Sequence, residues 1–186
     1  MTGGTAPIYH SRLQKGGALI EDMRALVRAW SSEPAAAHAT SPYASLAKAT
    51  RARAHDTLIR SFLPRFVAGN PPEAWRLVRP LEDAEADVEI LRPMYYWLTA
   101  RSDRLLYDYA TQELFAINQA GDRRIRREET FSWVKKQLLA ASQPAWSDSV
   151  TLRVSRGLVA ALRDFGLLEG QVIKRIASFH IPLPAF

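Results

Sequence analysis

The chain has 186 residues, of which 47% are hydrophobic and 24% charged, and its formal net charge is +6. This composition is that of a globular protein, and the length allows one compact domain or two packed halves. The chain contains no cysteine, which excludes disulfides, thiolate catalysis and cysteine zinc sites. No apolar stretch reaches the roughly 18 residues that a membrane-spanning helix needs, and the N-terminus has no apolar stretch of signal-peptide length. We therefore expect a cytoplasmic protein without a membrane partner.

The basic surplus is larger than the net charge indicates. Five of the 19 acidic residues lie between Glu82 and Glu89, "EDAEADVE", so the rest of the chain carries 25 basic and 14 acidic side chains. This surplus permits an anionic partner such as nucleic acid, although an ordinary arginine-rich protein has the same composition. We expect the acidic segment to lie near a helix start, where the helix dipole favours carboxylates, and not to hold a metal.

Helical periodicity dominates the first half of the chain. Apolar spacing predicts a helix from about Ala18 to Trp30, followed by an alanine-rich stretch that is interrupted near Ser41 and Pro42. Thr50 is positioned to cap a longer helix that ends near Phe66. After the breaker "GNPPEAW", Pro93 is expected to restart a short helix.

The second half has a distinctive order of elements. Ser102 and Asp103 are positioned to cap a helix to about Asn118, and a basic linker, "AGDRRIRREET", follows. A helix of about Glu128 to Ala141 should then bury Phe131, Val134, Leu138 and Leu139. Ser147 should cap a long helix that ends near Phe165, and "QVIKRIASF" is the best strand candidate.

This order predicts a mainly α protein with helix-turn-helix-like halves, of which the C-terminal half is winged by a short β-hairpin. The expected regions are an N-terminal helical region at 1–68, an acidic and aromatic connector at 69–101, and a winged region at 102–186. These regions can also pack as a single domain.

The helix that follows Ser147 has two chemically different faces. Val150, Val154, Leu158, Ala161, Leu162 and Phe165 fall on one side of a helical projection, and Ser149, Arg153, Arg156, Ala160 and Arg163 fall on the other. In a helix-turn-helix the second helix presents its outer face to the major groove, where arginine binds guanine edges or phosphates. The small residues Ser149, Gly157 and Ala160 would let this surface approach DNA closely.

Further basic residues surround this helix in the sequence. We expect Arg123, Arg124, Arg126 and Arg127 to hold phosphates, with Lys174 and Arg175 contributing from the wing. A weaker second surface is predicted around Arg51 and Arg53. The alternative is that these residues serve solubility and pair with nearby acids such as Glu128, Glu129 and Asp164.

Catalytic and cofactor motifs are not found. The four histidines have no metal-ligand spacing, and His55-Asp56 lacks the further ligands that a metal phosphohydrolase needs. No phosphate-binding loop or nucleophile elbow occurs. We therefore expect a protein that is not an enzyme and that binds no metal or cofactor.

At "YHSRLQKGGALIEDMRALVRAW", "WSDSVTLRVSRGLVAALRDFGLLEG" and "IASFHIPLPAF", the sequence resembles the BrxA family of BREX bacteriophage-defence systems. The resemblance covers nearly the whole chain and implies a helical, DNA-binding, non-enzymatic protein that acts beside other BREX proteins, including a methyltransferase and an ATPase. Some members carry an inner-membrane label, which the hydropathy of this chain contradicts. The chain ends on apolar "IPLPAF", where we expect relatives to continue.

The leading hypothesis is therefore a double-stranded-DNA-binding component of BREX phage defence. The rival is a helical adaptor that docks other defence proteins without touching DNA. A nuclease is a distant third hypothesis.

Overall fold

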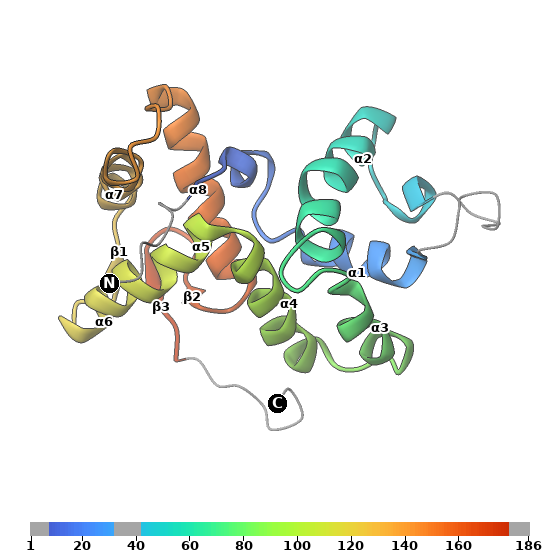
Figure 1. Ribbon diagram of the computed structural model, residues 1–186. Coiled ribbons are helices and arrows are strands. Elements are labelled where there is room, and N and C mark those ends of the chain that lie inside the picture. The colour runs from blue at the N-terminus through green and yellow to red at the C-terminus, as the bar shows by residue number, and fades with distance from the viewer. Residues whose placement is uncertain (1–7, 32–41, 179–186) are drawn as a thin grey trace, which may run out of the picture. The chain divides into compact units, whose positions relative to one another are not determined.

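The computed structural model describes residues 8–31 and 42–178, which form two units (Figure 1). The N-terminal unit comprises the described residues between Leu19 and Ser102. The C-terminal unit comprises the described residues before Leu19 together with those from Asp103 to Ser178. The described chain is mainly helical, with a small antiparallel sheet near the C-terminus, which confirms the predicted mainly α class. The final apolar segment of the sequence lies outside the described residues.

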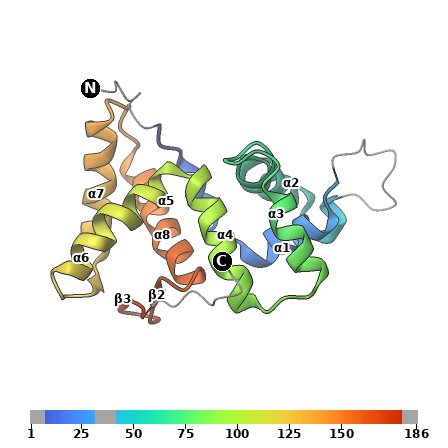
Figure 2. The ribbon, with the colours of Figure 1, turned by 60° about the horizontal axis from the view of Figure 1, so that its bottom comes forward.

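The N-terminal unit consists of helices and their connections (Figure 2). Thr50 Oγ1 accepts a hydrogen bond from Arg53 N, as predicted, and caps a helix whose second part has π geometry around Pro64. Ala54, Leu58, Phe62 and Phe66, which recur at helical spacing, are buried. The elements are α1 (Ile20–Ala29), η3 (Pro42–Ser45), α2 (Arg51–Thr57), η4 (Leu58–Val67), α3 (Trp75–Asp83) and α4 (Val88–Ser102).

The acidic segment corrects one expectation. Glu82 lies at the end of α3, and its buried carboxylate accepts hydrogen bonds from Arg24 Nε at 2.9 Å, Arg28 at 3.0 Å and the Tyr95 hydroxyl at 2.8 Å. The prediction that this segment begins a helix is wrong for Glu82, because two arginines of α1 neutralise it instead of a helix dipole. The pKa of Tyr95 is raised by burial and by Glu82.

Pro93 does not restart a helix. Helix α4 begins at Val88, five positions earlier, because the backbone N–H groups of Ile90 and Leu91 both donate to the Asp87 carbonyl and form its first turn. Pro93 lies inside this helix near its start.

The C-terminal unit holds a helical segment, a helix pair and a three-stranded sheet (Figure 1). Its sheet has the order β1-β3-β2, with all pairs antiparallel, and Arg124 lies opposite Arg175. Strand β1 lies in the basic linker, where no strand was expected from the sequence. The elements are η1 (Ser11–Lys15), α5 (Arg104–Asp108), η5 (Tyr109–Leu114), α6 (Phe115–Gln119), β1 (Arg124–Ile125), α7 (Arg127–Ala140), α8 (Asp148–Asp164), β2 (Leu168–Glu169) and β3 (Lys174–Ile176).

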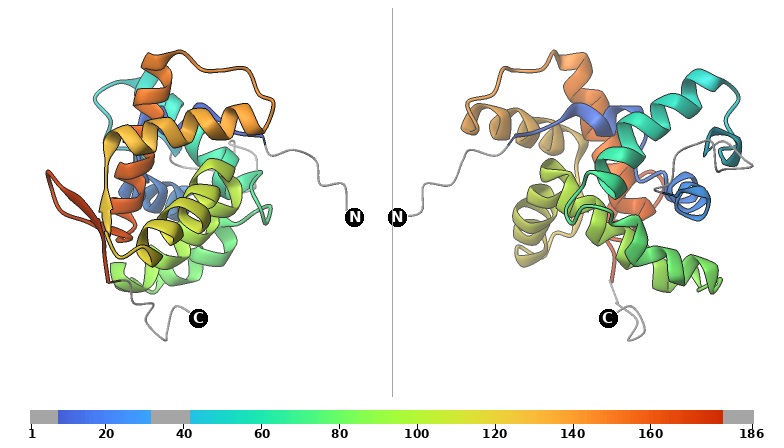
Figure 3. Two further views of the ribbon diagram at one scale, coloured as in Figure 1. Left: turned by 90° about the vertical axis from the view of Figure 1, so that its left-hand side faces the viewer. Right: turned by 45° about the vertical axis from the view of Figure 1, so that its right-hand side comes forward.

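Helix α8 contributes a row of buried side chains to the core of this unit. Val154, Leu158, Ala161, Leu162 and Phe165 are buried, as predicted, while Val150 is only half-buried. In Figure 3, α7 crosses α8 and the β2-β3 hairpin projects beside it. Trp133 of α7 was not among the predicted core residues, but it is buried. Its ring packs edge-on against that of Tyr109, with 5.0 Å between the ring centroids. Leu139, which was predicted to be buried, is 81% exposed.

The segment before Leu19 is bound to the C-terminal unit by polar contacts. Tyr9 N donates to Gln143 Oε1 at 2.6 Å, and Gln143 Nε2 donates back to the Tyr9 carbonyl. The Tyr9 hydroxyl donates to buried Asp108 at 2.8 Å, and Arg104 Nε donates to the same carboxylate oxygen. Burial, with a contribution from Asp108, raises the pKa of Tyr9 to about 12.

The N-terminal cap of α8 gives a first prediction. Ser147 Oγ accepts a hydrogen bond from Val150 N at 3.4 Å. We expect Ser147→Ala to lower the free energy of unfolding by about 1 kcal/mol, because a helix donor loses its partner. Urea denaturation followed by circular dichroism measures this loss. Ser147→Asp, which can also cap, should retain most of the stability, and an alanine variant as stable as the parent would contradict the role of the cap.

Candidate nucleic-acid interface

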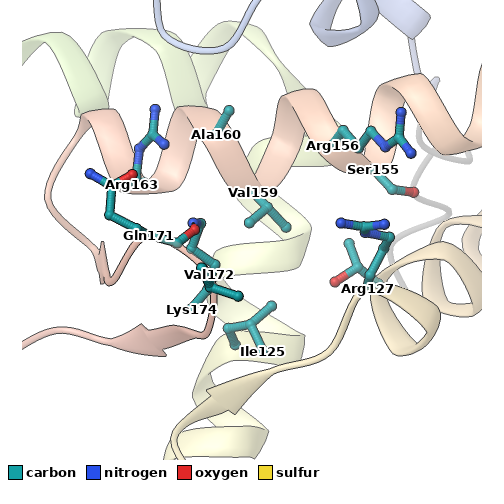
Figure 4. A pocket seen from close by; sticks show the side chains of 11 residues that line it. Ile125, Arg127, Ser155, Arg156, Val159, Ala160, Arg163, Gln171, Val172 and Lys174 are labelled. Atoms are coloured by element: carbon teal, nitrogen blue, oxygen red, sulfur yellow. The ribbon is translucent and has the colours of Figure 1, made fainter.

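A cavity of about 300 Å³ lies between α8, the start of α7 and the β2-β3 hairpin (Figure 4). Val159 and Ala160 of α8 form one wall, and Val172 of the hairpin faces them, with Ile125 of β1 alongside. Three segments that are separate in the sequence therefore meet at one place in the C-terminal unit. We call these residues, with the cationic side chains described next, the basic cavity.

The charged side chains of the basic cavity all have the same sign. Arg127, Arg156, Arg163 and Lys174 line it, and no acidic residue belongs to the described lining. Four cations around one concave surface concentrate positive potential there. An anion is therefore the ligand that this surface favours.

Two of these arginines have no partner among the residues that the structure describes. In the described part of the chain, neither Arg127 nor Arg156 forms an ion pair or a side-chain hydrogen bond. Both side chains are exposed, and their guanidinium groups lie on the same side of the cavity near Ser155 (Figure 4). Two unpaired guanidinium groups can together bind a phosphate, which accepts several hydrogen bonds from such donors.

The other two cations are partly engaged. Arg163 donates to Asp164 Oδ1 at 3.0 Å across an exposed ion pair, and exposed pairs of this kind contribute little stability and exchange readily. Lys174 Nζ donates to the carbonyl of Gln171 within the hairpin turn.

The hydroxyl groups in the cavity wall are bound within the protein. Ser155 Oγ donates to the Thr151 carbonyl at 2.8 Å. The Thr130 hydroxyl forms a 2.9 Å hydrogen bond with the Tyr109 hydroxyl. It also lies within hydrogen-bond distance, 3.1 Å, of the Arg126 carbonyl oxygen. Burial raises the pKa of Tyr109 to about 12, although its hydrogen bond to Thr130 acts in the opposite direction. These contacts hold the wall in place and leave the arginines as the groups that can bind a ligand.

The outer face of α8 continues beyond the cavity. Ser149, Arg153, Arg156 and Arg163 are all exposed, so the predicted alignment of these side chains is present. Among the described residues, Arg153 has no ionic partner. Gly157, however, does not belong to this face. A β-carbon at Gly157 would lie 1.8 Å from the Leu13 carbonyl oxygen. The glycine therefore allows η1 to pack closely against α8, and it does not provide space for an external ligand.

The arginines of the basic linker divide into different environments. Arg127 alone of the four lines the basic cavity. Arg123 donates to the Ile176 carbonyl at 2.8 Å and thereby joins the linker to β3. Arg126 pairs with Asp122 at 2.8 Å and Glu129 at 3.0 Å, and its pKa is raised by the hydrogen bond to Glu129 and by the charge of Asp122.

Arg124 and Arg175 form a second basic feature. They lie opposite each other on β1 and β3, both exposed, beside a hollow that also contains Asp122 and Glu169. Directly opposed like charges destabilise a strand pair unless an anion is nearby. Arg51 and Arg53 lie in the other unit, exposed on the first turn of α2.

Several residues of the cavity were not predicted from the sequence. Ile125, Val159, Gln171 and Val172 shape it, but each is an ordinary apolar or polar residue without a motif. The two-residue strand β1, which brings Ile125 and Arg127 to the cavity, is too short to produce an alternating pattern. The one signal in the sequence was an isoleucine, Ile125, between four arginines, which indicates a short segment with one buried side chain.

Other kinds of site are not evident in the described chain. Residues 8–31 and 42–178 contain no group of three or more side chains of the kinds that bind metal ions. Asp56, which follows His55 in the sequence, pairs with Arg60 at 3.2 Å. No helix in the described part of the chain combines the length and the apolarity that crossing a membrane requires.

The fold and site thus define a mainly helical protein whose C-terminal unit carries a small sheet and a basic cavity. The chain belongs to the BrxA family, whose model matches residues 7–184. Membership of this family points to a role associated with BREX phage defence. No curated protein and no solved structure matches the chain.

Proposed function

We propose that this protein is a non-enzymatic component of BREX phage defence that binds double-stranded DNA and works beside other BREX proteins. The observation that carries the proposal is the basic cavity, whose described lining has no acidic residue and includes Arg127 and Arg156, neither of which is paired within the described chain. DNA presents a regular array of phosphates, and cationic side chains that neutralise them supply most of the sequence-independent affinity.

The element order supports this proposal. The C-terminal unit runs helix, strand, helix, helix, strand, strand, with β3 between β1 and β2, and we infer that it is a winged helix-turn-helix. In such a motif the second helix of the pair enters the major groove. Here that helix is α8, so Ser149, Arg153, Arg156 and Arg163 would face base edges and flanking phosphates.

The basic cavity then has a defined role. A sugar-phosphate strand borders the major groove that α8 occupies, and the cavity lies between α8 and the hairpin. We infer that Arg127, Arg156 and Lys174 hold the phosphates of this strand. Arg124 and Arg175 would contact phosphates further along the same DNA strand. Arg123 and Arg126 would add positive charge, and their contacts with Ile176 and Asp122 hold the basic linker in place. Arg51 and Arg53 would form a separate, weaker DNA surface.

A salt series tests the proposal. The protein is titrated into a fluorescent random-sequence duplex at several salt concentrations, and binding is followed by anisotropy. We expect tight binding at low salt, with a slope of log affinity against log salt of about −4, since each phosphate contact contributes about −0.9. Magnesium is added in a parallel arm to detect cleavage.

Each outcome decides between the hypotheses. Absence of binding at low salt would overturn the proposal and favour the adaptor, for which the exposed Phe115 and Leu139 offer apolar contact. Cleavage of the duplex in the presence of magnesium would contradict the non-enzymatic assignment.

A further inference from the structure

Two adjacent apolar side chains stand at the tip of the β2-β3 hairpin. Val172 is 94% exposed and Ile173 is 57% exposed. Tight turns usually carry glycine, proline or short polar residues, so β-branched apolar residues at this position have no role in forming the turn. Because both are exposed, they are available to contact another molecule.

The conformation of the turn fixes where this pair stands. Gly170 has φ of +93°, and a β-carbon there would lie 2.1 Å from the Ile173 carbonyl oxygen. The backbone of the tip therefore folds tightly back on Gly170, a conformation that glycine adopts without strain. Lys174 Nζ donates to the Gln171 carbonyl and closes the turn from the other side.

The tip is continuous with the basic cavity. Val172 lines the cavity together with Gln171 and Lys174 of the hairpin, and it faces Val159 of α8 (Figure 4). Arg175, the next exposed residue of β3, adds a further cation. An apolar tip with cations on its flanks, joined to a phosphate-binding surface, is suited to a minor groove, whose sugar walls are apolar and whose rims are phosphates.

We propose that Val172 and Ile173 insert into the minor groove of DNA, next to the strand whose phosphates occupy the basic cavity. This inference rests on the proposed DNA binding. The strand in the cavity separates the major groove, where α8 lies, from the adjoining minor groove, which the hairpin tip then reaches. Apolar side chains in a minor groove contact sugar edges and wedge between base steps.

The test compares two double variants of the full chain. Val172→Ser with Ile173→Ser should weaken binding to a random-sequence duplex about tenfold, because apolar contact is lost. The slope of log affinity against log salt should stay unchanged, because no phosphate contact is lost. The control Phe115→Ser with Leu139→Ser removes two exposed apolar side chains that do not line the cavity, and it should bind like the parent. Thermal denaturation checks that each variant is folded.

A minor-groove ligand supplies the second measurement. Netropsin, which fills the minor groove of A·T-rich duplexes, should compete with the parent protein and should compete much less with the hairpin variant. If the parent binds DNA but the hairpin variant binds equally well, the insertion is wrong and the proposed function stands. If netropsin does not compete with the parent, the insertion is likewise wrong. If the parent does not bind DNA, both proposals fail.

Discussion

Replacing Arg156 and Arg163 together with glutamate is expected to weaken duplex binding by about a hundredfold or more at low salt. Both side chains line the basic cavity, which contains no acidic lining residue in the described structure. In the proposed complex, the two substitutions remove two cationic groups that would bind phosphates and add two negative charges beside those phosphates, so lost attraction and new repulsion act together. Fluorescence anisotropy with a random-sequence duplex measures the change.

A matched pair of single variants separates this local effect from net charge. Arg156→Glu and Lys136→Glu alter the net charge equally, and both side chains are exposed and form no salt bridge in the described chain. Lys136 lies on α7 and does not line the cavity. We expect Arg156→Glu to weaken binding much more than Lys136→Glu. Equal losses would mean that only net charge matters and that the cavity is not the binding surface.

Gly157→Ala is expected to destabilise the C-terminal unit by about 2 kcal/mol or more, the cost of overpacking a tight contact. The added β-carbon would lie 1.8 Å from the Leu13 carbonyl oxygen and 2.7 Å from its carbon. Both are backbone atoms, so no side-chain rotation relieves the clash. Helix propensity has the opposite sign, because alanine in a helix interior is favoured over glycine by about 1 kcal/mol. A lower free energy of unfolding would therefore show that the clash outweighs helix propensity, and a higher one would show the reverse.

Urea denaturation measures the stability of this variant, and amide hydrogen exchange of α8 and η1 locates the loss. Ala160→Gly, three positions along the same helix and only partly buried, serves as the control for helix propensity and should cost about 1 kcal/mol. A Gly157→Ala variant that is more stable than the parent would show that η1 does not pack against α8 as described.

The sequence carried enough information to predict α8 almost completely. Its cap at Ser147, its end before Gly166 and its two faces follow from local rules of capping and periodicity, and the structure confirms each of them. The exposed arginines could also be listed in advance, because their spacing along a helix determines the face on which they lie.

The features that were missed depend on contacts between distant residues. Tyr9 is bound by Gln143 and Asp108, more than 90 positions away, and no local pattern records such a contact. Gly157 was interpreted as an opening toward DNA because the sequence does not show that Leu13 occupies that side. Glu82 was placed at a helix start because its arginine partners, Arg24 and Arg28, lie on another helix.

Amide hydrogen exchange with and without a random-sequence duplex tests the central claim most directly, because it maps the bound surface on the intact protein. If DNA binds at the basic cavity, amide exchange should slow within Arg153–Arg163 of α8 and within the hairpin from Gly170 to Arg175 when DNA is present. Binding that leaves both segments unchanged, or that slows exchange only around Arg51 and Arg53, would contradict the assignment of the basic cavity as the DNA-binding surface.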